Sequence, residues 1–336
     1  MKPAAGRAPT SADVARLARV SRSTVSLVVN DVPNSRITQP TRERVLAAVK
    51  ELGYAPDVSA RQLRAGTSRL VLMPLPQLPL GPTMDTTIER LSEKLRASGL
   101  TLIVHGDRTA TGMAAARMWA EMRPAAVLVA ADRCTKSSVA LLRRAGTEVL
   151  MISGGPVPWA DALEFDQKRV GAEAAAHLLA VGHQHLAAIV PAGPLEGLGR
   201  ARAEGLVNTA RAAGAQSEEI VMAATHESAA AAVAAIRRPG GPTAVFTYND
   251  EYGALLHRAL GDQGVVMPDE IALVGADNLP IATFLRPTLS SVALDPVEMA
   301  DLMSAAVHSM LERPVHTEPI VAGMLATPVL VRRETT

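Results

Sequence analysis

Hydrophobic residues near the start of the chain recur at helical spacing. In the segments 11–18 and 22–29 they lie three and four residues apart, so each segment would have one apolar face as a helix. Thr10, followed by Asp13 three residues later, is a variant of the capping box, and Ser21 can cap the second segment. The pattern predicts two short helices joined by a tight turn.

A third helix is predicted over residues 39–52. Thr38 would be its N-cap, Pro40 lies in its first turn, and Gly53 would end it. Residues 57–64 have the pattern of one further helix of about two turns, which is too short to be stable alone in water. That segment would need a partner, either its own copy in a dimer or DNA.

From Arg69 onward, short apolar runs alternate with amphipathic segments. The apolar runs have the length of buried strands and cover residues 70–73, 100–104, 126–130, 149–152, 186–190, 220–222, 244–247 and 271–274. The helical segments between them cover residues 86–97, 137–145, 170–180, 201–213, 228–236 and 251–263. This alternation predicts parallel sheets with helices on both faces. So many strands favour two similar lobes with a ligand cleft between them.

The charge of the chain is unevenly distributed. Apolar residues make up 48% of the 336 residues, which is ample for a sizeable core, and the net charge is only +1. Residues 1–70, however, contain 12 Lys and Arg against 5 Asp and Glu, a net charge of +7. The remaining residues contain 22 against 28, a net charge of −6. A basic head on an acidic body indicates a nucleic-acid-binding domain attached to a second domain.

Several other classes of protein do not fit the sequence. The single cysteine, Cys134, excludes an internal disulfide framework and is typical of a reducing cytosol. No run approaches the roughly 20 apolar residues of a membrane span, and no signal-peptide-like stretch is found. Residues 197–202 begin like a dinucleotide fingerprint but have Arg202 in place of the third glycine. We therefore expect a cytoplasmic protein with no membrane partner, no metal or cofactor, and no catalytic residues.

Motifs in both parts of the chain match one family. In the head they are Asp13-Val14-Ala15, Val20-Ser21-x-x-Thr24-Val25-Ser26, Thr41-Arg42-Glu43-Arg44-Val45 and Leu52-Gly53-Tyr54-x-Pro56. In the body they are Gly182-His183, Arg202-x-x-Gly205, Asn249-Asp250 and Pro268-Asp269-x-Ile271-x-Leu273-Val274-Gly275-x-Asp277. In this order the motifs resemble the lactose-repressor (LacI/GalR) family, from about Thr10 to Val331.

The resemblance implies a homodimeric transcriptional regulator, of the repressor type, that binds a palindromic operator in double-stranded DNA. The second helix would lie in the major groove. Base contacts would come from Arg22, Ser23 and Leu27, and phosphate contacts from Ser21, Ser26, Asn30, Thr38 and Tyr54. The paired segments 57–64 would enter the minor groove, where Leu63 would be an apolar wedge with Ala60 beside it.

The body is similar to periplasmic sugar-binding proteins, and the resemblance implies an effector held between the two lobes. Arg202, Asn249 and Asp277 match effector-binding positions of the family. Together they offer donors and acceptors to a sugar or another small polar metabolite. Two features argue against a sugar: aromatic residues make up only 2% of the chain, and Leu294 stands where the lactose repressor has a polar residue near the cleft.

The predicted fold is an all-α helix-turn-helix head on an α/β, two-lobed, periplasmic-binding-protein-like body. Its domains would be a DNA-binding domain (1–56), a hinge helix with a linker (57–68) and an effector-binding and dimerisation domain (69–336). Two departures from the family leave an alternative open. Leu27 stands where many members have a polar base-contacting residue, and Arg19 stands where the turn usually has glycine. The alternative is a ligand-sensing module whose head binds DNA weakly and with little specificity.

Overall fold

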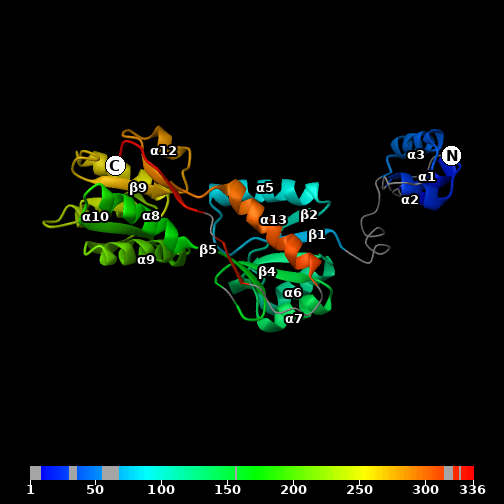
Figure 1. Cartoon of the computed structure of the whole chain (residues 1–336), viewed down its shortest axis with the longest axis horizontal. Helices are drawn as coiled ribbons and strands as arrows, with labels where there is room; N and C mark the ends of the chain where they lie inside the picture. The colour runs from blue at the N-terminus through cyan, green and yellow to red at the C-terminus, as the bar shows by residue number, and fades with distance from the viewer. Residues whose placement is uncertain (1–8, 30–35, 55–67, 156, 314–320, 325–326) are drawn as a thin grey trace. The chain divides into compact units, whose positions relative to one another are not determined.

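A computed structural model describes residues 9–29, 36–54, 68–155, 157–313, 321–324 and 327–336. The chain divides into two compact units, Met1–Ser68 and Arg69–Thr336. Figure 1 shows the described helices of the first unit and the helix-covered sheets of the second.

The head consists of α1 (Ser11–Ala18), α2 (Arg22–Val29) and α3 (Gln39–Leu52), with the predicted boundaries. Capping explains where these helices begin and end. The backbone N–H of Thr10 donates to Asp13 Oδ2 (2.9 Å), and the N–H of Thr24 donates to Ser21 Oγ (3.0 Å). Gly53 ends α3 in the left-handed conformation. The apolar stripes of the three helices meet in one small core that includes Val14, Val25, Val28, Val45 and Ala48.

The turn between α1 and α2 keeps the conformation that glycine would favour. Arg19 has φ 53° and ψ 50°, in the left-handed region. For a residue with a Cβ, this conformation is less stable than the right-handed one by roughly 1–2 kcal/mol. The N–H of Val20 still donates to Ala15 O (3.0 Å), so the turn closes over the end of α1. The helix-turn-helix shape is therefore retained, and Arg19 does not change it.

The first lobe of the body contains a six-stranded sheet within the described residues, in the order β11-β5-β4-β3-β1-β2. Its strands are β1 (Leu70–Pro74), β2 (Thr101–His105), β3 (Ala126–Ala130), β4 (Glu148–Ser153), β5 (Asp161–Phe165) and β11 (Val321–Met324). All of the pairs between them are parallel. Side chains of α5 (Pro82–Ala97) and α13 (Pro296–Glu312) pack on one face. Side chains of α6 (Gly112–Glu121) and α7 (Lys136–Arg144) pack on the other.

The second lobe contains a six-stranded sheet within the same described part of the chain, in the order β12-β10-β9-β8-β6-β7. Its strands are β6 (His185–Pro191), β7 (Gln216–Met222), β8 (Ala244–Thr247), β9 (Ala272–Ala276), β10 (Ser290–Ala293) and β12 (Val329–Val331). The pairing of β10 with β12 is antiparallel, whereas the other pairs are parallel. One face is covered by α8 (Gln167–Ala180) and α9 (Glu196–Ala212), and the other by α10 (His226–Ile236) and α11 (Asp250–Asp262). A short helix, α12 (Ile281–Phe284), follows β9.

The chain passes between the lobes repeatedly, so neither lobe is one continuous segment. It leaves the first sheet after β5 and enters the second through α8 and β6. It returns after β10 through α13 to β11, and it crosses again to β12. This confirms the predicted two-lobed body with helices on both faces of each sheet. All eight predicted strands are present, with ends that differ by a few residues.

Candidate DNA-binding and effector-binding sites

The two faces of α2 have different environments. Val25 and Val28 are buried in the head core, whereas Arg22 and Ser23 are exposed. Leu27, whose side chain is 37% exposed, lies on the same outward side of the helix. The three predicted base-reading residues therefore lie away from the core, along the side of the helix that can meet a partner.

Two of the predicted phosphate-contacting residues, Ser21 and Thr38, lie at helix starts. Ser21 caps α2, and its Oγ also lies 2.6 Å from Ser23 Oγ. Thr38 is exposed immediately before α3, Ser26 is half-buried, and Tyr54 packs against the head core. Helix N-termini present free backbone N–H groups, which suit phosphate oxygens. Asn30, Ala60 and Leu63 lie outside the described residues.

In the second lobe, the structure brings Arg202 and Asp277 together although they are far apart in sequence. Arg202 lies on α9 and is only 5% exposed. Its Nη2 donates to Asp277 Oδ1 (2.9 Å), its Nε to Gln167 Oε1 (2.9 Å) and its Nη1 to the carbonyl of Tyr248 (2.5 Å). The guanidinium carbon also lies 5.0 Å from the centre of the Tyr248 ring. All three guanidinium nitrogens of Arg202 thus have partners within the protein.

Asn249, the third predicted effector residue, belongs to the same region but has a structural role. It follows β8, and its Oδ1 accepts the N–H of Tyr252 (3.0 Å), so it caps α11. Its Nδ2 donates to Glu251 Oε2 (3.2 Å). Because the side chain is buried and has both of these partners, an effector would reach it only after a rearrangement.

Asp277 follows β9 at the carboxyl end of the second sheet, the place where ligands gather in parallel sheets. It borders a cavity of about 650 Å³ between the lobes, a volume that suits a small molecule. The first lobe contributes Pro82, Thr83 and Thr86 from the start of α5. The second lobe and the segments between the lobes contribute the remaining lining residues, among them Asn278, Leu294, Asp295, Glu298 and Thr327.

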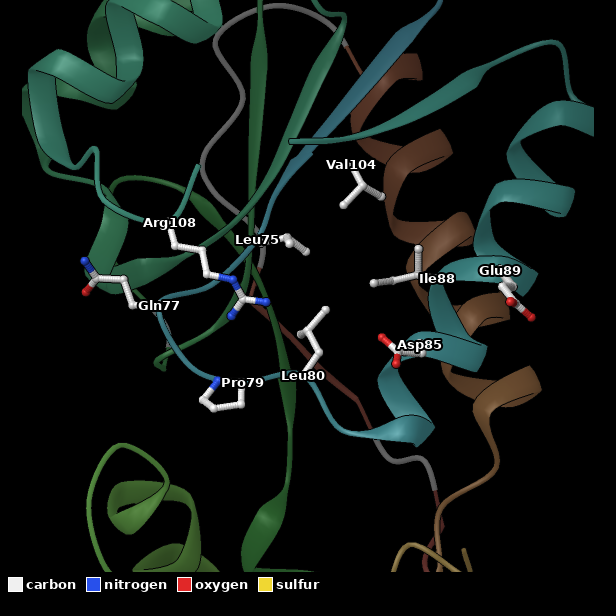
Figure 2. Close-up of a pocket in the computed structure, with 9 residues that line it drawn as sticks. All are labelled: Leu75, Gln77, Pro79, Leu80, Asp85, Ile88, Glu89, Val104 and Arg108. Carbon is white, nitrogen blue, oxygen red and sulfur yellow. The ribbon is translucent and has the colours of Figure 1, made fainter. Parts of the chain in front are cut away.

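A second cavity, of about 790 Å³, lies within the first lobe (Figure 2). Leu80, Ile88 and Val104 face it from the loop after β1, from α5 and from β2. Arg108 fixes this loop, because its Nη1 donates to the carbonyls of Pro76 (3.1 Å) and Leu78 (2.5 Å). Apolar side chains line this cavity near β2, and Gln77, Asp85, Glu89 and Arg108 add polar and charged groups to its lining.

The sequence did not single out Gln167 or Tyr248, which hold Arg202 from two sides. Gln167 follows β5, a strand that the apolar pattern did not predict. Tyr248 follows the predicted strand 244–247 and precedes Asn249, so its place at a carboxyl strand end was a usable signal. Its hydrogen bond to Arg202 uses the backbone carbonyl, so the type of side chain at position 248 gave no indication of that bond.

Comparison with known proteins identifies the family. The description "Bacterial regulatory proteins, lacI family" matches residues 10–57, and "Periplasmic binding protein-like domain" matches residues 175–336. The HTH-type transcriptional repressor PurR of Vibrio atlanticus (strain LGP32) is 30% identical over 299 residues, covering 84% of this chain and 86% of that protein. The chain belongs to the lacI family.

Two further relatives cover the head and the body together. The HTH-type transcriptional regulator DegA of Bacillus subtilis (strain 168) is 27% identical over 298 residues, which are 85% of this chain and 87% of that protein. A crystal structure of the lac repressor dimer bound to operator and the anti-inducer ONPF matches with a TM-score of 0.79 and 23% identity. That match covers 98% of this chain and 99% of the repressor.

These matches confirm the family and the fold that the motifs predicted. This lacI-family protein is a DNA-binding transcriptional regulator whose body binds an effector. Its relatives are transcriptional regulators rather than enzymes. Across the residues that the structure describes, no helix has both the length and the apolar character needed to cross a membrane.

Proposed function

We propose that this regulator is a repressor that binds a palindromic operator as a homodimer, in the cytoplasm, where the DNA lies. The observation that carries the proposal is α2, a capped helix with Arg22, Ser23 and Leu27 facing outward from a basic head. Arg19 keeps the helix-turn-helix shape with a left-handed backbone, and this removes one of the two reasons for doubting that the head reads DNA. Only Leu27 still supports the alternative of a weakly specific head.

The base contacts follow from side-chain chemistry. Arg22 can donate two hydrogen bonds to a guanine, and Ser23 can pair with several bases. Leu27 offers an apolar contact to the methyl group of a thymine. The phosphate contacts proposed for Ser21, Ser26, Asn30, Thr38 and Tyr54 would fix the register, and Leu63 with Ala60 would widen and kink the central minor groove.

The homodimer is supported by exposed apolar residues on both lobes. Edge strand β2 exposes Ile103 and Val104, and edge strand β7 of the other sheet exposes Val221, 52% of which is accessible. On α12, Phe284 is 77% exposed and Ile281 lies one turn before it. Unpaired strand edges with apolar side chains can pair with another chain, and exposed apolar patches mark interaction sites. We propose a second copy of the chain as the partner that covers these residues.

The effector site is proposed at the cavity between the lobes. Each guanidinium nitrogen of Arg202 already donates one hydrogen bond within the protein, so we propose that its main role is to hold Asp277. The remaining polar lining, with Asp277, Asn278, Thr83 and Thr86, suits a molecule rich in hydroxyl or amine groups. Effector binding would close the lobes and change the order of residues 57–64, which couples the cavity to the operator.

Fluorescence anisotropy with a palindromic duplex and a scrambled duplex, at two salt concentrations, tests the DNA-binding proposal. We expect tighter binding to the palindrome, with a salt dependence that reflects several phosphate contacts. Equal, weak binding to both duplexes would support the alternative instead.

A thermal-shift screen of small polar metabolites tests the effector proposal, since a ligand that binds only the folded state raises the melting temperature of the protein.

A further inference from the structure

The carboxylate of Asp250 is buried, and it does not line the cavity between the lobes. Asp250 is the first residue of α11, and it is 0% exposed. Its Oδ1 accepts the hydroxyl of Ser291 (2.7 Å), and its Oδ2 accepts the backbone N–H of Leu279 (2.6 Å). Burial raises its pKa to about 7, although these two hydrogen bonds act in the opposite direction. Burying an ionisable carboxylate is energetically unfavourable, so we expect Asp250 to have a specific role.

The segment that Asp250 contacts is a backbone turn in an unfavourable conformation. Asp277 and Asn278 have φ values of 83° and 49°, so two successive residues with side chains lie in the left-handed region. Such residues cost of order 1–3 kcal/mol each and persist only where surrounding contacts hold them. The turn joins β9 to α12 and carries the carboxylate that pairs with Arg202.

Three successive N–H groups hold this turn. That of Asp277 donates to Val292 O (2.8 Å), that of Asn278 to Ser291 Oγ (3.0 Å) and that of Leu279 to Asp250. Ser291 thus accepts from the turn and donates to Asp250, so the two side chains act as one unit. Each N–H of the turn is satisfied from β10 or α11.

Gly275 provides the space that the carboxylate of Asp250 occupies. A Cβ at Gly275 would lie 2.1 Å from Asp250 Oδ1, far inside any tolerated contact. Gly275 is in the middle of β9, where glycine is otherwise unfavourable, so the close approach of Asp250 gives it a reason. Asp250, Ser291 and Gly275 are all buried beside one another.

We propose that Asp250 is a positioning residue of the effector site, which together with Ser291 holds the left-handed turn 277–279 and thereby fixes the carboxylate of Asp277 against Arg202. The effector role of this site rests on the proposed function. Three charged groups act on Asp250: Asp277 disfavours its ionised form, Arg333 favours it, and Arg202 interacts with it through space. Without Asp250, the turn would relax and Asp277 would lose its orientation toward the cavity.

Amide resonances of the full chain, recorded by ¹⁵N TROSY across neutral pH, test the proposal. An amide that donates to a carboxylate reports its titration, so we expect the Leu279 proton to move upfield as the pH falls through about 7. Asp250→Asn should abolish this titration and increase hydrogen exchange at Asn278 and Leu279 at least tenfold. Asp262→Asn, at the exposed end of the same helix, is the matched control and should change neither.

The side-chain Nε–H resonance of Arg202 separates positioning from mere stabilisation. It should shift in Asp250→Asn and stay in place in Asp262→Asn, because only the former would disturb Asp277. If the turn loosens while Arg202 is unchanged, Asp250 does not position the site. A Leu279 resonance that does not titrate in the unmodified chain would also overturn the proposal.

If Asp250→Asn does not fold, Ser291→Ala provides the same test, since loss of its hydrogen bond should move the Leu279 titration to higher pH. None of these measurements uses DNA or effector, so their outcome is independent of the DNA-binding and metabolite tests.

Discussion

The contact between α8 and α9 leads to a sharp prediction about stability. A Cβ at Gly171 of α8 would lie 1.8 Å from the carbonyl oxygen of Arg202, and one at Gly205 of α9 would lie 1.9 Å from that of Lys168. Ordinary van der Waals contacts of a Cβ lie at 3.4–4 Å. The two helices therefore pack with their backbones in direct contact, and this brings Gln167 of α8 to the guanidinium of Arg202.

Substituting Gly171 by alanine would force these backbones apart. Alanine favours a helix over glycine by about 1 kcal/mol. Overpacking a tight core costs typically 1–3 kcal/mol, and a clash with backbone rather than with a flexible side chain lies at or above the upper end. We therefore expect a net loss of about 2 kcal/mol. For a unit of this size that corresponds to a fall in melting temperature of roughly 4–8 °C.

Thermal unfolding of the full chain, followed by circular dichroism at the helical band, measures this effect. Gly261→Ala is the matched control, because Gly261 lies in α11 and nothing is within 4 Å of its Cβ position. It should raise the free energy of unfolding by about 0.5 kcal/mol or leave it unchanged. The reasoning fails if Gly171→Ala matches the control or the unmodified chain.

Three further predictions concern other parts of the molecule. Leu27→Arg should retain binding but change the preferred operator in selection from randomised duplexes; an unchanged preference would exclude base contact at this residue. The raised pKa of Asp250 means that its contribution to stability is complete below pH 3.8 and is lost as the pH rises through about 7, a loss of roughly 4 kcal/mol. Urea midpoints should therefore decline between about pH 4 and about pH 7 and level off at higher pH, with a shallower decline in Asp250→Asn. Phe284→Ser should weaken the dimer by about tenfold or more in sedimentation equilibrium, whereas an unchanged dissociation constant would place the interface elsewhere.

Local signals explain why the head was predicted to the residue. Thr10, Ser21, Thr38 and Gly53 mark helix ends through interactions within a few residues, which a sequence displays directly. In the body, β5 and β10 are strands that the apolar pattern missed, and both have buried polar residues. In β10, for example, Ser290 and Ser291 are fully buried because they bond to Thr335 and Asp250, partners more than 40 residues away. Such burial depends on distant partners and leaves no hydrophobic signature.

The distinction between local and distant partners also applies to the candidate effector site. Arg202 and Asp277 were identified by their match to family motifs, and the structure places them in contact. The pattern did not show that Arg202 is occupied within the protein, because Gln167 and the carbonyl of Tyr248 lie 35 and 46 residues away along the chain. In the sequence, Asp250 stands out only as part of the Asn249-Asp250 motif, yet it makes contacts that hold the turn. Hydrogen-bond partners across such separations follow from topology, which periodicity does not specify.

The position of the cavity explains how a ligand there could change the whole body. Its lining includes Leu294 and Asp295, where the chain leaves β10 for α13, and Thr327, where it passes from β11 toward β12. The remaining passage, from β5 to α8, carries Gln167, which is bonded to Arg202 and through it to Asp277. A ligand that filled the proposed site would therefore lie against the described parts of two passages between the lobes, and through Asp277 and Arg202 it would be linked to the third. Since those segments are where a change of lobe angle must be absorbed, a small differential contact at this one cavity can shift the equilibrium between open and closed bodies.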